Sequence, residues 1–308
     1  MMYTFDHILV CLDLSEMDDA LIRYANFLVT KFKPQSITFL HVMKSYDIPA
    51  EMLDAFPHLD KPLVEIVENE VQEKIEGLFS HPKETQTIVK VVEGVTTDTI
   101  VKYTRENKII FTLMGKKIGY KGRGGIVRKV ISIIPSSVLL ISETTYPHLE
   151  HLLVRMDFSR MSSQALKMAF KIKEITGAQI SCHHAFKLPL KYFPQSSPEK
   201  DKKLVDYAAK HSKKEFDKFL NKNKLQGEDI DFTSSLDPEN NEADILYRHA
   251  LTSGADIIII GSKIKSELAD IILDSTSEKL ATAEKNIPVL IIKDRKQTIG
   301  FLKALFKS

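Results

Sequence analysis

The chain repeats one succession of strands and helices twice along its 308 residues. Short apolar, β-branched runs alternate with helix-length segments, which is typical of βαβ units and a mostly parallel sheet with helices on both faces. Landmark residues at the predicted strand ends recur at a nearly constant separation. The pairs are Asp13 and Asp157 (144 positions apart), His41 and His184 (143), Gly115 and Gly261 (146), and Val138 and Val289 (151). This regularity predicts an α/β protein made by tandem duplication, whose first copy is shorter just after Gly115.

Each copy is predicted to contain five strands. In the first copy they are His7–Leu12, Ser36–Val42, Thr87–Val92, Lys108–Met114 and Ser137–Ile141. In the second copy they are Leu152–Met156, Gln179–His184, Ile230–Thr233, Asp256–Ile260 and Val289–Ile292. We expect one domain over residues 1–146, a second over 147–294, and a tail over 295–308 with the pattern of a short amphipathic helix. Two proline-containing loops, 46–62 and 187–197, follow the second strand of each copy, either as lids or as plain surface loops.

Composition and charge exclude several classes of protein. The sequence is 43% hydrophobic and 27% charged, which excludes global disorder. Its 43 basic and 41 acidic residues leave a net charge of +2, too small to indicate a general nucleic-acid binder. No apolar run is long enough to span a membrane, and the first residues do not have the pattern of a signal peptide. The two cysteines, Cys11 and Cys182, have no CxxC spacing, so we expect no zinc site or disulfide framework and a cytoplasmic location.

An aspartate follows the first strand of each copy. Asp13 and Asp157 stand beyond the carboxyl end of a strand, where open parallel sheets bind their ligands. Such a carboxylate could accept a hydrogen bond from a ribose hydroxyl or a base amino group. The alternative is that Asp13 or Ser15 caps the following helix. The recurrence in both copies favours ligand contact in at least one of them.

A glycine-rich, basic loop follows the fourth strand of the first copy. Five of the chain's 12 glycines fall within eleven residues: Gly115, Gly119, Gly122, Gly124 and Gly125. Glycine lets backbone N–H groups approach an anion closely, and the helix predicted to start near Gly125 adds its positive end. The flanking basic residues are Lys116, Lys117, Lys121, Arg123, Arg128 and Lys129. The pattern favours a polyphosphate ligand over a plain basic surface loop.

The corresponding segment of the second copy has the opposite character. It has one glycine, Gly261, and six acidic residues lie between Gly254 and Ile292. Among them, Asp274 stands near the start of a predicted helix, where a carboxylate would take the place of a phosphate. We therefore expect nucleotide binding in the first copy alone.

Several of these motifs together resemble the universal stress protein family. In the first copy they are ILVCLDLSE, FLHV, a strand ending in Met-Gly, and a helix leading to PSSVLLI; in the second they are LLVRMDFSRMSSQAL, ADIIIIGS, STSEKL and IPVLIIK. The resemblance extends to about Lys293 and implies two such domains in tandem. It implies a five-stranded parallel sheet in the order 3-2-1-4-5 for each domain. Because many members pair domains through the fifth strand, internal pairing of the two halves is implied as well.

The resemblance also implies a nucleotide site. Nucleotide-binding members carry G-x2-G-x9-G-[ST] after the fourth strand and an Asp after the first. The matching positions here are Asp13 at the nucleoside, Val42 beside the adenine, Gly115 as first glycine, Gly124 as third and Gly125 at the Ser/Thr position. The loop is shorter in this chain, so Gly119 or Gly122 stands in for the second glycine. In the second copy Gly261 and Ser275 match, whereas Ile264 and Asp274 replace the other two glycines.

The candidate site for ATP or a related adenine nucleotide, with Mg²⁺, combines the strand ends and this loop. Its residues are Leu12, Asp13, Val42, Gly115, Gly119, Gly122, Gly124, Gly125 and Ile126. The sequence contains no P-loop or HExxH motif and no evident base paired with a nucleophile, which disfavours catalysis. Three functions stay open. The first is a stress-response protein that binds nucleotide and acts through its conformation, through a protein partner or as a homo-oligomer. The second is a scaffold without nucleotide, and the third is a slow ATPase.

Cys182, His183 and His184 follow one another near the end of a predicted strand. Adjacent residues of a strand point to opposite faces, so these three side chains cannot converge on one metal ion. We expect His41 and His184 to be hydrogen-bonded histidines at strand ends.

Overall fold

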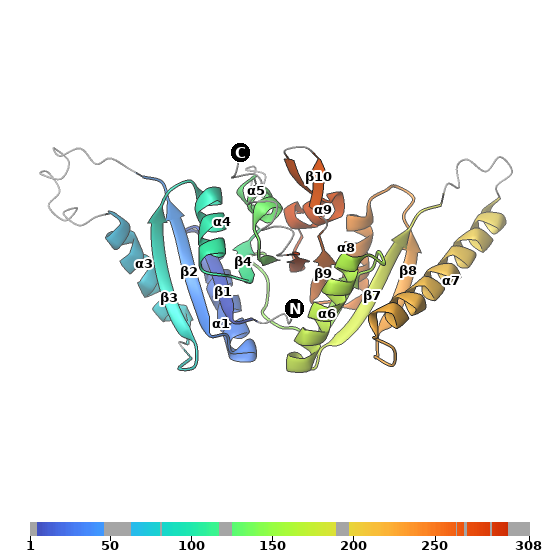
Figure 1. The fold of residues 1–308 in the computed structure, drawn as a ribbon, viewed down its shortest axis with the longest axis horizontal. Helices are drawn as coiled ribbons and strands as arrows, with labels where there is room; N and C mark the ends of the chain where they lie inside the picture. Colours follow the sequence, from blue (N-terminus) through green and yellow to red (C-terminus); the bar gives the residue numbers. More distant parts are fainter. Residues whose placement is uncertain are drawn as a thin grey trace, which may run out of the picture.

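The structure is a computed structural model, and it describes residues 5–45, 63–80, 82–116, 125–188, 197–262, 264–267, 270–283 and 285–294. Strands and helices alternate in both halves (Figure 1). The first half contains β1 (His7–Leu12), α1 (Met17–Phe32), β2 (Ser36–Met43), α3 (Leu63–Leu78), β3 (Gln86–Glu93), α4 (Thr96–Glu106), β4 (Phe111–Gly115), α5 (Gly125–Ile133) and β5 (Ser137–Ile141). The second half contains β6 (His151–Arg155), α6 (Arg160–Thr176), β7 (Gln179–Phe186), α7 (Pro198–Asn223), β8 (Asp231–Leu236), α8 (Glu242–Ser253), β9 (Ile257–Gly261), β10 (Ile264–Glu267), β11 (Asp270–Leu273), α9 (Ser275–Thr282) and β12 (Val289–Ile292).

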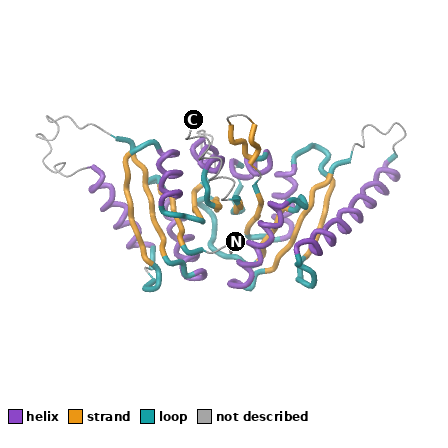
Figure 2. Tube along the Cα trace, in the orientation of Figure 1, coloured by secondary structure: helices purple, strands orange, loops and turns teal. Residues whose placement is uncertain are grey.

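One ten-stranded sheet runs through both halves in the order β3-β2-β1-β4-β5-β12-β9-β6-β7-β8. Neighbouring strands within each half are parallel, in the expected order 3-2-1-4-5. At the junction β5 and β12 run antiparallel, with Leu139 opposite Leu290. The implied pairing of the two halves through their fifth strands is therefore confirmed, and Figure 2 shows the strands continuing from one half into the other between layers of helices.

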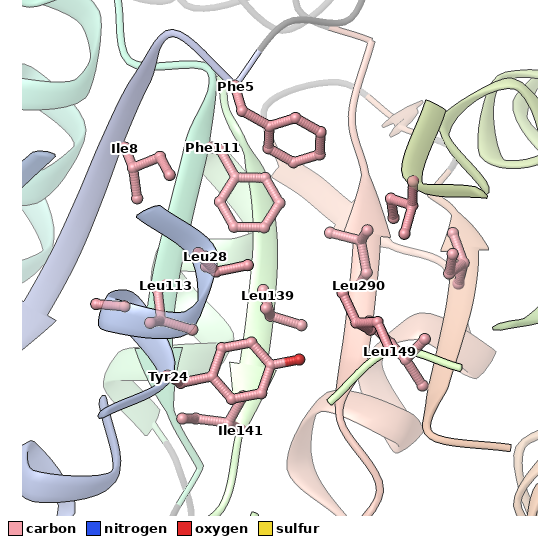
Figure 3. Packing of buried hydrophobic residues seen from close by; sticks show 14 of the residues in the cluster. Phe5, Ile8, Tyr24, Leu28, Phe111, Leu113, Leu139, Ile141, Leu149 and Leu290 are labelled. Atoms are coloured by element: carbon pink, nitrogen blue, oxygen red, sulfur yellow. The ribbon is translucent and has the colours of Figure 1, made fainter. Parts of the chain in front are cut away.

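Apolar side chains cover both faces of the sheet. On β5, Leu139 belongs to the cluster beneath α1 and α6, whereas Val138 and Leu140 belong to the cluster beneath α4, α5, α8 and α9. This alternation is that of a strand buried on both faces. The first cluster crosses the junction, where Leu139 of the first half and Leu290 of the second lie close together (Figure 3). The two halves therefore share a hydrophobic core.

The predicted strands are found in the structure, with one notable shift. β4 begins at Phe111 and not at Lys108. Lys108 has a φ of 52°, and the amide of Ile109 donates to the carbonyl of Thr104 at 3.0 Å. These residues therefore close the end of α4, because a positive φ interrupts an extended strand.

A hairpin that the sequence analysis did not predict follows β9. Its strands β10 and β11 pair antiparallel, with Ile264 opposite Leu273, at the place where the two copies differ in length. The predicted tail over 295–308 and most of both proline-containing loops (46–62 and 189–196) lie outside the described residues. None of the described helices combines the length and apolarity needed to cross a membrane.

Candidate functional site

The carboxyl ends of β2, β1 and β4 are neighbours in the sheet. This arrangement brings Leu12 and Asp13, Val42, and Gly115 to one edge of the first half. Leu12 is buried, Val42 is half-buried, and Asp13 is exposed on the loop that follows β1. The strand-end part of the predicted site is therefore contiguous, and its exposed carboxylate belongs to Asp13.

A buried carboxylate organises the turn between β1 and α1. The side chain of Asp18 is fully buried and accepts hydrogen bonds from the amides of Asp13 and Leu14, each at 3.0 Å. Burial raises the pKa of Asp18, although these hydrogen bonds and the charge of Lys74 act in the opposite direction. Asp18 thus fixes the backbone that carries Asp13. The sequence analysis missed it, and the signal was a second aspartate within one turn of the predicted helix start.

The alternative role of Asp13 or Ser15 as a helix cap is seen in part, at Ser15. The N-cap of α1 is Glu16, whose side chain makes no capping hydrogen bond. Ser15 instead donates its hydroxyl to the carboxylate of Asp13 and accepts a bond from the amide of Met17 at 3.3 Å. Ser15 therefore bonds the first amide of α1, and Asp13 lies in the same turn as the acceptor of the Ser15 hydroxyl.

Gly115 has a packing role that the sequence analysis did not anticipate. A Cβ at this position would lie 2.4 Å from Cγ of Met17, the first residue of α1. The second half repeats the arrangement, because a Cβ on Gly261 would lie 2.2 Å from the carbonyl oxygen of Met161. Both glycines allow a helix to pack directly on a strand, so their recurrence has a structural explanation independent of any ligand.

The N-terminus of α5 has few neighbours among the residues that the structure describes. Of these residues, none would lie within 4 Å of a Cβ on Gly125, and Ile126 is half exposed. The first turn of α5 carries no acidic residue. The other glycines of the predicted loop, Gly119, Gly122 and Gly124, lie outside the described residues.

Two of the basic residues that flank the loop are directed to the second half. Lys116 is buried, and its ammonium group donates to the carbonyl of Ile287 at 2.9 Å. Burial, together with the nearby charge of Lys285, lowers the pKa of Lys116 to about 8. The guanidinium group of Arg128 lies 2.8 Å from the carboxylate of Glu278 in α9. The expectation that the flanking lysines assist phosphate binding is thus wrong for Lys116, which links the two halves.

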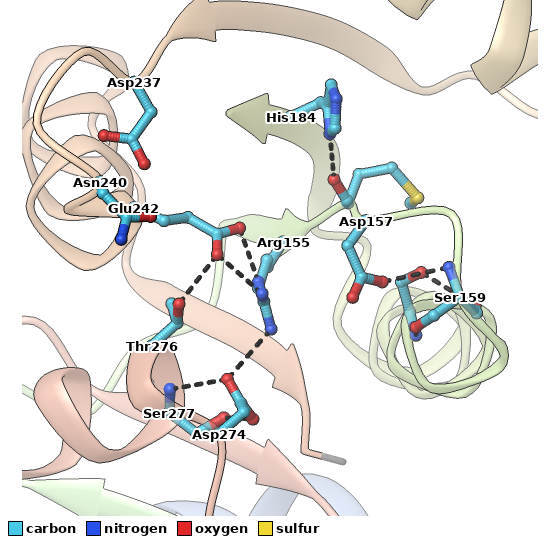
Figure 4. A network of polar contacts seen from close by, with 12 residues as sticks. Arg155, Asp157, Ser159, His184, Asp237, Asn240, Glu242, Asp274, Thr276 and Ser277 are labelled. Atoms are coloured by element: carbon cyan, nitrogen blue, oxygen red, sulfur yellow. Dashed lines mark hydrogen bonds and ion pairs between the residues drawn. The ribbon is translucent and has the colours of Figure 1, made fainter. Parts of the chain in front are cut away.

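The corresponding edge of the second half is filled by an ion-pair network (Figure 4). Arg155, at the end of β6, donates to both carboxylate oxygens of Glu242, each at 2.7 Å, and to Asp274 at 3.3 Å. Burial alone would lower the pKa of Arg155, but the bonds and charges of Glu242 and Asp274 raise it. A guanidinium held by two carboxylates leaves little attraction for an added anion at Arg155 itself.

Asp274 also occupies the N-terminus of α9, as the sequence led us to expect. Its carboxylate accepts bonds from the amide of Ser277 at 3.2 Å and from the hydroxyl of Ser277 at 2.6 Å. The hydroxyl of Thr276 donates to Glu242 at 2.8 Å, which ties the cap to the Arg155 network. The positive end of α9 is therefore already satisfied by a carboxylate of the chain itself.

The strand-end histidines behave as predicted. The ring of His41 is hydrogen-bonded to the carbonyl of Leu12 at 3.1 Å, and that of His184 to the carbonyl of Met156 at 2.7 Å. His183 lies on the other face, with its ring nitrogens bonded to the hydroxyls of Thr233 and Ser235. Within the described parts of the chain, no group of three or more His, Cys, Asp or Glu residues is placed to hold a metal ion.

His183 makes the second half sensitive to acid. It is buried, stacks on the ring of His249 at 4.1 Å, and lies beside His184. Burial and these two histidines lower the pKa of His183 to about 3. As the pH falls below about 6.5, His183 is therefore protonated in the unfolded chain while it is still neutral in the folded protein. At about 1.4 kcal/mol per pH unit, the contribution of His183 to the free energy of unfolding should fall by about 2 kcal/mol when the pH is lowered from 7 to 5.

Urea unfolding at pH 7, 6 and 5 measures this dependence. The His183→Asn variant should lose this part of the pH dependence, whereas the same change at His211, an exposed residue of α7, should keep it. Equal pH dependence in the wild type and in His183→Asn would contradict the assignment.

Comparison with known proteins supports the architecture. Residues 4–142 and 148–293 each match the universal stress protein family. A universal stress protein from Archaeoglobus fulgidus has 19% identity and a TM-score of 0.66, covering 94% of this chain and 99% of its own. A functionally unknown protein from Pseudomonas aeruginosa PAO1 has 13% identity and a TM-score of 0.66, covering 99% of this chain and 98% of its own. A putative universal stress protein from Pseudomonas aeruginosa UCBPP-PA14 has 15% identity and a TM-score of 0.63, with the same coverage.

The solved structures show the likeness of fold, and the two family matches cover most of the chain. No curated protein sequence matches the chain significantly. The duplicated sheet order, the strand-end aspartates and the two matched segments agree with one another. The chain therefore belongs to the universal stress protein family and carries two domains of that family in tandem.

Proposed function

We propose that the first domain binds an adenine nucleotide such as ATP, in the cytoplasm, and that the protein acts through its conformation or a partner and not through turnover. The base and ribose would lie at the ends of β1 and β2, near Asp13 and Val42. The phosphates would lie between Gly115 and the N-terminus of α5. The second domain would not take part in this binding.

The contrast between the two helix N-termini is the observation that carries the proposal. No described residue lies within 4 Å of the Cβ position of Gly125 in α5, and no acidic residue lies in the first turn of that helix. The equivalent helix α9 is capped by the carboxylate of Asp274 and has Glu278 in its first turn. Because a helix N-terminus attracts negative charge, only α5 has this attraction available for a phosphate.

A bound nucleotide at α5 would be linked to the second domain. Arg128 of α5 pairs with Glu278 of α9, and Lys116 at the end of β4 bonds to the carbonyl of Ile287. A shift of α5 around a phosphate would change these bonds and the surface that the two domains present together. This is the route by which binding would act without catalysis.

Calorimetric titration with ATP, as its magnesium complex, tests the proposal at Gly125. The wild type should bind one nucleotide, and Gly125→Asp should weaken binding at least roughly ten-fold, about 1.4 kcal/mol, because a carboxylate would occupy the phosphate position. The matched variant Gly125→Ser places a hydroxyl donor at the same position, which has room for it. It should bind ATP at least as well as the wild type.

The strand-end aspartates provide a second, matched pair. Asp13→Ala should weaken ATP binding, because Asp13 would contact the nucleoside, whereas Asp157→Ala should leave it unchanged. If the wild type produces no heat with ATP, or if both aspartate variants bind equally, the nucleotide proposal is wrong.

The second candidate is a scaffold that works through its surfaces without nucleotide. It is favoured by Lys116 and Arg128, two basic residues beside the loop whose charges already contact the second domain. Absence of ATP binding in the titration would support this function.

A further inference from the structure

Three polar side chains, which we call the row, lie near the carboxyl ends of adjacent strands in the second domain. By the strand register Ser262 and Lys293 are level with each other, whereas Arg155 is level with Ile260, two residues earlier. Arg155 ends β6, Ser262 follows β9, and Lys293 follows β12. The pairing of β9 with β12 continues to this point, because the amide of Ser262 donates to the carbonyl of Ile292 at 3.0 Å. Ser262 and Lys293 are therefore cross-strand neighbours.

The row lies on the face of the sheet covered by α8 and α9. Residues two positions earlier on the three strands, Leu153, Ile260 and Ile291, belong to the apolar cluster on that face. Side chains alternate along a strand, so the row projects to the same side. The contacts of Arg155 with Glu242 of α8 and Asp274 of α9 agree with this placement.

Two members of the row are buried and have no hydrogen-bond partner in the described part of the chain. Ser262 is 1% exposed and Lys293 is 3% exposed. Neither the hydroxyl of Ser262 nor the ammonium of Lys293 has a partner among the residues that the structure describes. Burying an unpaired ammonium is costly, so a folded protein normally supplies it with an acceptor.

The equivalent row of the first domain has its partners. Its members are Cys11, Lys116 and Ser142, which correspond to Arg155, Ser262 and Lys293 by the repeat. Lys116 bonds to the carbonyl of Ile287, and the hydroxyl of Ser142 lies 3.0 Å from that of Thr145. The duplication itself therefore does not explain the unpaired groups of the second domain.

We propose that Lys293 and Ser262 form a binding site for a small carboxylate in the second domain. The ammonium and hydroxyl groups offer adjacent donors that suit the two oxygens of one carboxylate. A carboxylate would bring a single negative charge next to the ammonium of Lys293. A multiply charged phosphate would be repelled more strongly than a carboxylate by Asp274, which lies close enough to raise the pKa of Lys293. The site is independent of the proposed nucleotide site.

Saturation-transfer NMR of the acetate methyl group, at constant ionic strength, tests this site. The wild type should give a saturable signal that neither ATP nor inorganic phosphate displaces. Lys293→Met, which replaces the ammonium by an apolar group of similar length, should abolish it, and Ser262→Ala should weaken it several-fold. The control Lys116→Met removes the buried lysine of the first domain, which stands at the position matching Ser262, and should keep the signal.

Proton uptake gives a second measurement. Burial lowers the pKa of Lys293 to about 8, so about half of the molecules are neutral at pH 8. Acetate binding should then be accompanied by uptake of up to about half a proton per protein molecule at pH 8 and almost none at pH 6. The uptake is measured by calorimetry, as the difference in binding heat between two buffers of different ionisation enthalpy. A wild type without a saturable signal, a signal that persists in folded Lys293→Met, or displacement of acetate by phosphate would overturn the proposal.

Discussion

Replacing Arg155 by methionine is expected to lower the free energy of unfolding by about 3–5 kcal/mol. Arg155 and Glu242 are largely buried and share two hydrogen bonds of 2.7 Å. Methionine fills much of the same space but leaves the carboxylates of Glu242 and Asp274 facing each other without a cation. The loss should appear as a lower midpoint in urea unfolding.

Two further variants separate the ion pair from the general effect of removing an arginine. Arg248 forms an ion pair with Asp244 on the surface of α8, where its side chain is 69% exposed. Arg248→Met should therefore cost less than about 1 kcal/mol. Adding Glu242→Leu to Arg155→Met should recover part of the loss, because it removes one of the unpaired carboxylates. A loss for Arg155→Met no larger than that for Arg248→Met would show that the buried network does not stabilise the fold.

A second large effect is expected from a single methyl group at Gly261. The Cβ of Gly261→Ala would lie 2.2 Å from the carbonyl oxygen and 2.4 Å from the carbonyl carbon of Met161. Both are backbone atoms in the first turn of α6, so the helix must move away from β9. We expect a loss of about 3 kcal/mol in the free energy of unfolding, at the upper end for overpacking.

The chain offers graded controls for this substitution. Gly115→Ala meets the side chain of Met17, which can rotate, so its cost should be smaller, about 1–2 kcal/mol. Gly77→Ala, in α3, meets nothing within 4 Å and should stabilise the protein by up to about 1 kcal/mol, because alanine favours the helix. The same urea unfolding measurement ranks the three. If Gly261→Ala is no less stable than Gly77→Ala, the conclusion that α6 packs too closely on β9 to admit a Cβ at Gly261 is wrong.

The sequence predicts the strands and their duplication well because these depend on local patterns. Apolar runs such as His7–Leu12 and Ser137–Ile141 have the predicted bounds. The helix-capping role of Asp274 was also accessible, because a carboxylate at a helix start has a local physical effect. The pairing of β5 with β12 followed from the family resemblance and not from the residues of either strand, and the structure adds that it is antiparallel.

Contacts between distant parts of the chain were not predictable in this way. Lys116 looks like one of several loop lysines, yet its ammonium bonds to Ile287, 171 positions away. The partner of Arg155, Glu242, is 87 positions away. A charged residue inside the apolar run LLVRM does signal that a buried partner is needed, but the run cannot identify it. The hairpin of β10 and β11 was missed because two strands of four residues each give too little periodicity.

The antiparallel junction of β5 and β12 has a consequence for how this molecule responds to dilution. Strand pairing between separate subunits weakens as protein becomes scarce, whereas here both edges belong to one polypeptide and meet at a high effective concentration. The junction therefore forms to the same extent whether a cell contains few or many copies of the protein. The same holds for the bonds of Lys116 and Arg128, which cross this junction and do not depend on the expression level.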